Sequence, residues 1–507
     1  MPRVRRLESA HTHRTHRLTP ATTAHPADAC PLYVDLDGTL TPSDTLYESV
    51  MLFIRRNPLN LFRLFAWLLL GKAGFKLKLA NAVRPDPARL PYHERFLQYL
   101  REEHARGRSL VLASAADSRI VRDVAAHLKL FDDTLGTNAR ADGVNLSRGN
   151  KRDAIAAHAQ AHGHSSWAYA GNSSDDIAVW RGSAQAVAVN APAGVVAALQ
   201  QVHPQARVFE REPLRLKTVL RAIRLKQWSK NALLFIPLLA SHRLDPHLWG
   251  LVLVAFVAFG LCASATYLFN DLLDLPNDRA HRLKRFRPLA AATISIPLAV
   301  ALGSVMLVLA FVLAWAVSLA FAAMLLVYTA TTLAYSLVLK RQALVDVLVL
   351  SGLYTLRIAA GAVAAQVALS NWLAAISIFL FLSLALVKRC AELEELDDER
   401  TTLAPGRGYQ PRDLPSLRAM GMASGFLAVM VLALYIDSQN SEMLYANPQW
   451  LWAAAPVLLL WVMRIWLKTG RRELHGEDPL QFALKDPFSW LTLLAMGSIG
   501  IAATIGL

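Results

Sequence analysis

The stretch NDLLDLPNDRAHRLKRFRP, residues 270–288, follows an apolar run at about 249–270 and places acidic and then basic side chains at its end. An apolar run of roughly 20 residues is the length that a helix needs to cross a bilayer. Similar runs recur from about residue 231 onward, whereas residues 31–204 carry only shorter apolar segments. The 507-residue chain is therefore predicted to join a soluble α/β domain to an all-α membrane domain.

The apolar runs predict nine membrane spans, at about 231–248, 249–270, 294–313, 317–336, 345–365, 372–390, 417–436, 449–467 and 488–507. Lys and Arg concentrate before the first span and in alternate connections between the spans. Because positive residues near span ends mark the cytoplasmic side, the pattern predicts a multi-pass protein of the cell (inner) membrane. The N-terminal domain and the charged span ends would lie in the cytoplasm, and nine spans would place the two chain ends on opposite sides.

Residues 1–30 are rich in Arg, His, Thr and Pro, which predicts a disordered basic tail, with an organellar transit peptide as the alternative. The three cysteines have neither metal-site spacing nor a disulfide framework. The net charge of +15 gathers beside the predicted spans without a nucleic-acid fold signature. We therefore expect the lipid bilayer and anionic substrates as partners, and no nucleic acid. The oligomeric state stays open.

Asp271, Asp274 and Asp278 are spaced three and then four residues apart, which would stack their carboxylates on one helix face. Oxygen ligands on one face, with room for a substrate phosphate, suit Mg²⁺. The Lys and Arg residues that follow could hold phosphate oxygens. Together the two groups predict a site that grips a magnesium diphosphate.

Pro276 interrupts this pattern and is expected to end or kink the helix near Leu275, so that Asp278 would come from a loop. A transporter or flippase also buries charge within helices, but its site normally lies near the bilayer midplane. Here the charges gather at one end of the spans, which favours an interfacial enzyme over that alternative.

The pattern N-D-x-x-D-x-x-x-D, with the basic residues behind it, resembles the first signature of the UbiA superfamily of intramembrane prenyltransferases. More narrowly, it resembles the branch typified by decaprenyl-phosphate phosphoribosyltransferase. Further matches are LKQWSKN (225–231), YSLVLKRQALVDV (335–347), LRIAAG (356–361), LSLALVKRCAEL (382–393), GRGY (406–409) and DPLQFALKD (478–486). The superfamily's usual second D-x-x-x-D is replaced by Lys388, Arg389 and Glu392, as it is in the phosphoribosyltransferase branch.

The resemblance implies transfer of a 5-phosphoribosyl group from phosphoribosyl diphosphate to a polyprenyl phosphate. Asp271 and Asp274, with Asp278 nearby, would hold the Mg²⁺ that neutralises the leaving diphosphate. The expected substrate-phosphate contacts are Lys230, Asn270, His281, Lys284, Arg285, Arg287, Tyr335, Lys340, Lys388, Arg389, Glu392 and Tyr409. The alternative is transfer of a prenyl group from a prenyl diphosphate to an aromatic or other acceptor through the same metal site.

In the N-terminal half, LYVDLDGTL (32–40) is a short apolar strand that ends in Asp35 and Asp37, which could serve as nucleophile and acid/base. It resembles motif I of the haloacid dehalogenase (HAD) superfamily. The later motifs follow in order, as LVLASAAD (110–117), RGNKRDAI (148–155) and YAGNSSDD (169–176). The resemblance implies a Rossmann-like α/β fold over residues 31–204 with a helical cap at about 45–105.

By this resemblance Asp35 would form an aspartyl-phosphate and Asp37 would protonate the leaving group. Ser114 and Lys151 would bind the transferring phosphoryl group. The Mg²⁺ ligands would come from Asp35, Asp37, Asn172, Asp175 and Asp176. Asn172 stands where the family usually has Asp, so both a working phosphatase and an inactive module remain open.

Residues 59–80 are apolar with interspersed basic residues, which predicts cap helices that pack within the cap, with the membrane surface as the alternative. Residues 205–230 would form a linker and amphipathic segment before the transferase domain at 231–507. A transferase that leaves a 5-phosphate on its lipid product suggests that the HAD domain removes that phosphate, aided by the short connection.

Overall fold

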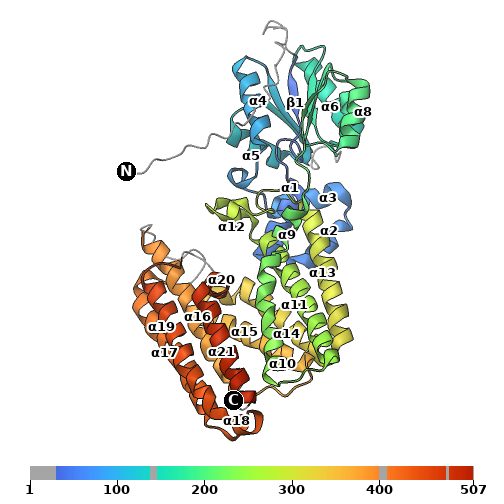
Figure 1. The fold of residues 1–507 in the computed structure, drawn as a ribbon. Helices are drawn as coiled ribbons and strands as arrows, with labels where there is room; N and C mark the ends of the chain where they lie inside the picture. The colour runs from blue at the N-terminus through green and yellow to red at the C-terminus, as the bar shows by residue number, and fades with distance from the viewer. Residues whose placement is uncertain (1–29, 138–144, 399–407, 475–478, 506–507) are drawn as a thin grey trace, which may run out of the picture. The chain divides into compact units, whose positions relative to one another are not determined.

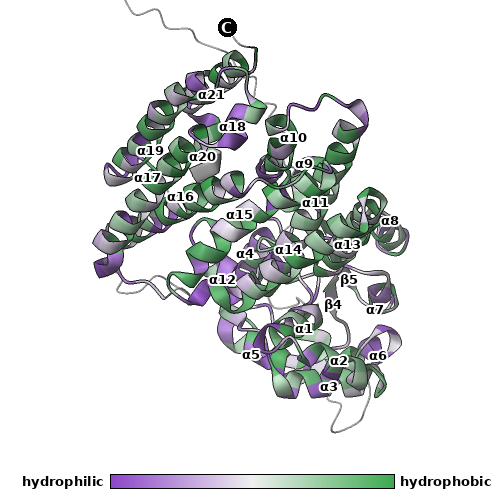
Figure 2. Ribbon diagram, turned by 90° about the horizontal axis from the view of Figure 1, so that it is seen from below, coloured by the Kyte–Doolittle hydropathy of each residue, from purple (hydrophilic) through white to green (hydrophobic). Residues whose placement is uncertain are grey.

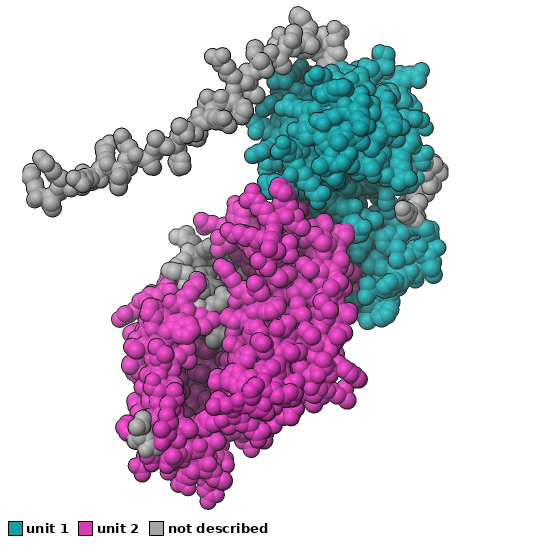
Figure 3. Space-filling model, turned by 45° about the vertical axis from the view of Figure 1, so that its right-hand side comes forward, with its two compact units in different colours: residues 1–53, 58–212 teal, residues 54–57, 213–507 magenta. Residues whose placement is uncertain are grey.

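The computed structural model describes residues 30–137, 145–398, 408–474 and 479–505. It divides into two compact units, residues 1–53 with 58–212 and residues 54–57 with 213–507 (Figure 3). The tail expected over residues 1–30 lies almost wholly outside the described residues, as do parts of the GRGY and DPLQFALKD segments. Each unit is described by itself.

The first unit is built on a six-stranded parallel sheet of order β3-β2-β1-β4-β5-β6. The strands are β1 (Leu32–Val34), β2 (Leu110–Asp117), β3 (Asp133–Thr137), β4 (Ala168–Gly171), β5 (Gln185–Val189) and β6 (Arg207–Phe209). Since all strands run the same way, the loops that follow β1, β2 and β4 meet at one edge of the sheet, where ligands bind in such folds. The expected α/β fold is confirmed.

Helices cover both faces of this sheet, which is why its strands are apolar almost throughout. On one face Leu32 and Val34 pack with the core of α4 (Glu94–Ala105) and α5 (Ser118–Leu128). On the other face Tyr33 packs with α6 (Arg148–Ala161), α7 (Ile177–Trp180) and α8 (Ala193–Val202) (Figure 1). Successive apolar side chains of β1 thus point to opposite faces, and each face packs against its own layer of helices.

A helical insertion follows the loop after β1, in the place expected for a cap. It consists of α1 (Thr45–Arg56), α2 (Asn60–Leu68) and α3 (Gly71–Ala82). From α3, the Lys76 Nζ donates to the Ala115 carbonyl oxygen at 2.8 Å and to Asn145 Oδ1 at 2.9 Å. The cap is therefore anchored beside the end of β2.

The second unit is helical, and eight helices among the described residues are long and apolar enough to span a membrane. They are α11 (Pro246–Leu273), α13 (Ile296–Val317), α14 (Leu319–Leu337), α15 (Val345–Ala364), α16 (Asn371–Asp398), α17 (Leu414–Ile436), α19 (Ala454–Gly470) and α21 (Pro487–Ile505). Helices α11, α13 and α21 are largely hydrophobic along their length (Figure 2). Shorter helices are α9 (Leu216–Ala222), α12 (Leu275–Ala280), α18 (Gln439–Leu444) and α20 (Pro479–Lys485).

The prediction of nine spans is wrong at residues 231–248. This stretch is divided between the 3-10 helix η4 (Leu225–Phe235), the short α10 (Ile236–Ala240) and a turn. His242 adopts a left-handed conformation with φ of 54°, and Pro246 begins a new helix, so one continuous helix cannot form here. An even number of candidate spans also removes the basis for placing the chain ends on opposite sides.

The acidic stretch breaks near Leu275, as expected, but both sides of the break are helical. Helix α11 ends at Leu273, Asp274 is the junction, and α12 carries Pro276 in its first turn, where the missing N–H costs nothing. The break therefore precedes Leu275, and Asp278 lies buried on α12 and not on a loop. Proline starts the second helix here instead of ending the first.

Candidate active sites

The first candidate site lies where β1 and β4 end in the α/β unit. Lys151 Nζ, from the first turn of α6, lies 3.0 Å from Asp35 Oδ1 and 3.5 Å from Asp176 Oδ1. The Tyr169 hydroxyl lies 2.9 Å from Lys151 Nζ and donates to Asp176 Oδ1 at 2.6 Å. Lys151, Asp35 and Asp176 are 4%, 7% and 2% exposed. One buried cation thus pairs with two buried carboxylates, because a buried charge without a partner would be costly.

Burial and neighbouring charge set the proton affinities at this site. Burial raises the pKa of Asp35, and Lys151 partly offsets that rise. Burial also raises the pKa of Asp37, and the Asp44 carboxylate adds to the rise. Although burial opposes it, the Asp35 and Asp176 carboxylates raise the pKa of Lys151. The site therefore holds a firmly charged lysine beside an Asp37 that retains its proton more readily than an exposed aspartate, which suits a general acid.

Asn172 packs against the loop that carries the two motif I aspartates. Its Oδ1 accepts from Thr39 Oγ1 at 3.3 Å. Gly38 has φ of 79°, and a Cβ there would lie 2.1 Å from Asn172 Nδ2, so the loop needs glycine for this approach. Asp35, Asp37 and Asn172 offer carboxylate and amide oxygens, the ligand set that Mg²⁺ prefers. These residues fit a magnesium ion with one neutral ligand.

The two remaining acids of the loop after β4 point in different directions. Asp176 Oδ2 accepts from the backbone N–H groups of Asn172 and Ser173 at 3.0 and 2.9 Å, which fixes its carboxylate. Asp175 instead pairs with Arg148 at 2.7 Å, and both side chains are largely exposed. The structure therefore brings Asp176 into the cluster and leaves Asp175 at the surface. Ser114 lies buried in β2, where its Oγ accepts from the Ala116 N–H at 3.1 Å.

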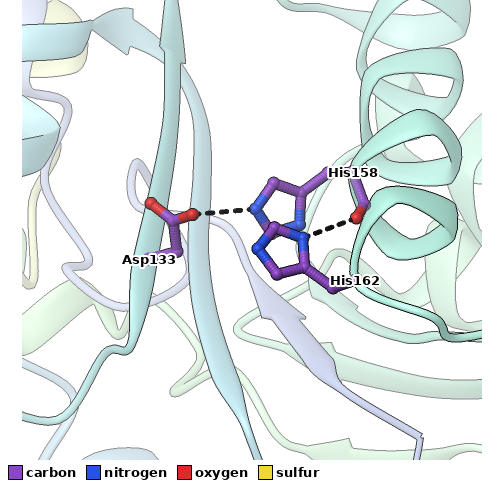
Figure 4. A group of neighbouring side chains, drawn as sticks. All are labelled: Asp133, His158 and His162. Atoms are coloured by element: carbon purple, nitrogen blue, oxygen red, sulfur yellow. Dashed lines mark hydrogen bonds and ion pairs between the residues drawn. The ribbon is translucent and has the colours of Figure 1, made fainter.

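Asp133, His158 and His162 form a separate group that could also hold a metal ion (Figure 4). His158 Nε2 lies 2.9 Å from Asp133 Oδ2, and His158 Nδ1 lies 2.8 Å from the Tyr33 hydroxyl. His162 Nδ1 lies 2.9 Å from the His158 carbonyl oxygen. Asp133 is the first residue of β3, at the end of the sheet where the parallel strands begin, whereas the motif residues lie where the strands end. The group ties α6 to β3 and takes no part in the phosphoryl site.

The second candidate site is a cavity of about 290 Å³ within the helical unit. Its charged and amide lining comes from residues far apart in the chain, namely Arg224, Lys230, Asn270, Asp274, Asp278, Lys284, Arg287, Lys340, Arg357 and Lys388. Aromatic and aliphatic side chains complete it, among them Tyr267, Tyr328, Tyr335, Tyr354, Leu353, Phe381 and Leu384. Most residues predicted for the transferase site therefore line one cavity.

The acids of this cavity are paired with cations. Arg287 Nη1 bridges Asp278 Oδ2 at 2.6 Å and Asp271 Oδ1 at 3.1 Å. Arg224 Nη2 reaches Asp271 Oδ1 at 2.5 Å, although Asp271 itself stands just behind the lining. Lys340 Nζ lies 3.4 Å from Asp274 Oδ2. Asp274 and Asp278, with Asp271 behind them, offer carboxylate oxygens, the kind of ligand that Mg²⁺ prefers.

Several predicted phosphate contacts lie away from the cavity lining. His281 and Arg285 are exposed, and His281 Nδ1 accepts from the Leu283 N–H at 3.2 Å. Arg389 is 1% exposed and donates to Asp346 Oδ2 at 2.6 Å and to Glu392.

Tyr409 also bonds to Asp346, and Arg389 donates to the Tyr335 hydroxyl at 3.4 Å. The structure thus places the buried Arg389 and Tyr409 and the partly exposed Glu392 in a network outside the cavity lining. Only Tyr335 belongs to both that network and the cavity lining.

Among the residues of the cavity lining that were not predicted are Arg224, Tyr267, Tyr328 and Tyr354. Arg224 lies in a basic segment before the spans, where a positive residue is expected both for substrate binding and for membrane topology, so that the two roles cannot be told apart. Arg357 lies in the matched LRIAAG segment; its Nη2 donates to the Tyr328 hydroxyl at 2.8 Å and its guanidinium lies 5.2 Å from the Tyr354 ring centroid. A single buried Arg in an apolar helix was the available signal. Tyr169 was missed because it lies in an apolar strand.

The folds and sites define a multi-pass membrane unit with a cavity lined by acidic and basic residues, joined to a HAD-like α/β unit. The chain belongs to the UbiA prenyltransferase family, whose model matches residues 232–484. Residues 32–181 match the model of the haloacid dehalogenase-like hydrolases. Both family resemblances expected from the motifs are confirmed.

Relatives differ in how much of the chain they cover. Uncharacterized protein y4nM of Sinorhizobium fredii is 37% identical over 463 residues, which cover 91% of this chain and 88% of that protein. Decaprenyl-phosphate phosphoribosyltransferase of Mycobacterium tuberculosis is 34% identical over 294 residues, covering 57% of this chain and 95% of that enzyme. A UbiA homolog from Archaeoglobus fulgidus, solved with GPP and Mg²⁺, aligns with 16% identity and a TM-score of 0.42 over 57% of this chain and 100% of that one.

Proposed function

We propose that the membrane unit transfers a 5-phosphoribosyl group from phosphoribosyl diphosphate to a polyprenyl phosphate, with the site on the cytoplasmic side. The excess of cations in the cavity carries this proposal. Its lining holds two acids, Asp274 and Asp278, and seven Lys and Arg residues, namely Arg224, Lys230, Lys284, Arg287, Lys340, Arg357 and Lys388. Such an excess suits substrates with a diphosphate, a sugar phosphate and a lipid phosphate better than a single prenyl diphosphate.

Asp271, Asp274 and Asp278 would hold Mg²⁺, whose chemistry when bound is to neutralise charge on the leaving diphosphate. Arg287 contacts two of these acids and is placed to bind phosphate oxygens beside them. Lys340, which contacts Asp274, is placed likewise. The cations would thus stabilise the negative charge that develops as the bond to the anomeric carbon breaks.

The apolar part of the lining supports a lipid acceptor. Leu350, Leu353, Phe381 and Leu384 come from α15 and α16 and share the cavity with the charged residues. A polyprenyl chain could lie along these helices while its phosphate meets the cations. The relative from Mycobacterium tuberculosis, which is named for this kind of transfer, agrees with the proposal.

The test is label transfer in full-length protein reconstituted in nanodiscs with decaprenyl phosphate and Mg²⁺. Label from the ribose of phosphoribosyl diphosphate is expected in the lipid phase. Asp274→Asn removes a metal acid and is expected to abolish the transfer, whereas Arg285→Gln, at an exposed position outside the cavity lining, is the matched control. Absence of ribose label, with prenyl transfer from a prenyl diphosphate to an aromatic acceptor observed instead, would overturn the proposal.

The HAD-like unit is proposed to remove the 5-phosphate from the lipid-linked product. In support, Asp35, Lys151 and Asp176 are already assembled at the sheet edge. Phosphate release from synthetic polyprenyl-phosphoribose 5-phosphate measures the step directly. Asp35→Asn is expected to stop the release, while the exposed Asp153→Asn leaves it unchanged. Equal release from wild type and Asp35→Asn would show an inactive module.

A further inference from the structure

The cap of the α/β unit carries an apolar face that is exposed. In α2 and the turn after it, the exposed large apolar side chains are Leu61, Phe62, Phe65, Leu68, Leu69 and Leu70. Phe62 is 70% exposed and Leu69 is 89% exposed. We name these six residues the cap face.

The inner side of α2 is packed and anchored. Leu64 is buried, and Asn60 Nδ2 donates to the Phe53 carbonyl oxygen at 2.8 Å. Trp67 stacks on Phe53 with ring centroids 4.9 Å apart. The exposure of the cap face is therefore a property of a fixed helix and does not come from a loosely attached segment.

The cap face is concentrated in one place. Among the other described residues of this unit, Leu59, Tyr47 and Val202 are the large apolar side chains exposed to a similar degree, and Leu59 directly precedes α2. Scattered single exposures are ordinary on proteins, but a contiguous apolar patch marks an interaction site. Something apolar is expected to cover it.

The charge of the segment that contains the cap face favours an anionic bilayer as its partner. From Ser49 to Pro85 the sequence has no Asp or Glu. The same stretch carries the basic residues Arg55, Arg56, Arg63, Lys72, Lys76, Lys78 and Arg84, of which Lys76 contacts Ala115 and Asn145 on the far side of the cap and Arg84 pairs with Asp123. Phe and Leu on one side of a helix, within a purely basic segment, is the pattern of helices that lie in the headgroup region of anionic membranes. The same chain carries helices that are long and apolar enough to span a membrane.

We infer that the cap face docks into the headgroup and acyl boundary of an anionic lipid bilayer. The far side of the cap adjoins the phosphoryl site, because Lys76 of α3 contacts the carbonyl of Ala115, the residue after Ser114. A cap seated in this way would present the site to phosphates on lipids at the membrane surface. This deepens the proposed lipid substrate of the HAD-like unit, but the docking itself does not depend on which phosphate is removed.

The test uses full-length protein in nanodiscs with a single environment-sensitive fluorophore. Cys30 is replaced by Ser, and the buried Cys262 and Cys390 are kept. The label is placed through Phe62→Cys, and the control label through Gln160→Cys, at an exposed position of α6. Nanodiscs contain phosphatidylcholine alone or with phosphatidylglycerol, each with and without brominated acyl chains.

The Phe62 label is expected to show blue-shifted emission and quenching by the brominated lipids, both stronger with phosphatidylglycerol, while the Gln160 label shows neither. Equal responses at the two positions would overturn the inference. So would a blue shift without lipid quenching, which would mean that protein covers the face, either this chain's own helices or a second copy.

A second variant separates docking from catalysis. Phe62→Ser with Leu69→Ser is expected to lower turnover of the lipid-linked phosphate several-fold while turnover of water-soluble p-nitrophenyl phosphate is unchanged. Loss of both activities to the same extent would contradict the inference. An inactive HAD-like unit would void the proposed phosphatase function but would leave the fluorescence result unaffected.

Discussion

Replacing Lys151 with methionine tests the buried charge cluster of the α/β unit. The change keeps most of the side-chain volume but leaves the Asp35 and Asp176 carboxylates without their cation, which lies 3.0 and 3.5 Å from them. With an effective dielectric constant of about 20, Coulomb's law gives about 5 kcal/mol for each contact before desolvation is counted. Breaking a buried pair by removing one partner costs about 3–5 kcal/mol, and we expect a loss of unfolding free energy in that range.

The pH dependence of this loss has a defined sign. Burial raises the folded-state pKa of Asp35, and removal of Lys151 takes away the group that offsets the rise. A raised folded-state pKa contributes stability below the unfolded pKa, and that contribution is lost as the pH rises through the folded-state pKa. The deficit of Lys151→Met relative to wild type should therefore be larger at about pH 8 than at about pH 5.

The assay is pulse proteolysis of full-length protein in nanodiscs across a urea series, without Mg²⁺, following survival of the α/β unit. Arg152→Met is the matched control, because its partner Asp153 and Arg152 itself are both about half exposed or more. Its loss should be no more than about 1 kcal/mol. A deficit for Lys151→Met below about 1 kcal/mol, or one that grows as the pH falls, would refute the role assigned to this cluster.

Three further changes test other parts of the structure. Gly361→Ala would place a Cβ 2.1 Å from the Leu234 carbonyl oxygen and should destabilise the membrane unit by about 1–3 kcal/mol. Gly352→Ala, on the same helix, places its Cβ in open space and should be neutral or stabilising. Thermal unfolding of the two variants checks this contrast. Asn172→Asp adds a carboxylate at the proposed HAD metal site and should lower the Mg²⁺ concentration needed for half-maximal hydrolysis of p-nitrophenyl phosphate, and an unchanged Mg²⁺ titration would be contrary to that role. Chelation with EDTA should abolish phosphoribosyl transfer and added Mg²⁺ should restore it, so that transfer surviving chelation would exclude the metal-assisted step.

The α/β unit was largely predictable because its motifs are local and ordered. Each of LYVDLDGTL, LVLASAAD and YAGNSSDD contains a strand, and parallel pairing brings the strand ends together. Asp35, Lys151 and Asp176 meet as the resemblance implies. Tyr169 could not be predicted, because within an apolar strand an aromatic side chain reads as core and its hydroxyl carries no separate signal.

The membrane unit shows where sequence patterns are ambiguous. Residues 231–248 were predicted to form a span because they are apolar, and hydropathy does not reveal the turn near His242. The spacing of Asp271 and Asp278 predicted one continuous helix face, but the helix breaks between them, and Arg287 contacts both carboxylates across the break. Arg224 was not predicted as a site residue, because a basic residue before a span determines topology in most membrane proteins.

The periodicity of the sequence could not predict which side of α2 is buried. Residues 59–70 are apolar on nearly every side, so the sequence favoured packing within the cap over a membrane surface. In the structure, Leu64 turns inward and Phe62 and Leu69 turn outward. Which side is buried was decided by tertiary contacts such as the Asn60 bond to Phe53, which no local pattern reports.

The most direct test of the central claim follows two labels of phosphoribosyl diphosphate, ¹⁴C in the ribose and ³²P at the 5-phosphate, into decaprenyl phosphate in nanodiscs. Wild-type protein should give a lipid that carries the ribose label and has lost the 5-phosphate label, and Asp35→Asn should give a lipid that keeps both. Absence of ribose label from the lipid phase in both proteins would contradict the phosphoribosyl transfer itself.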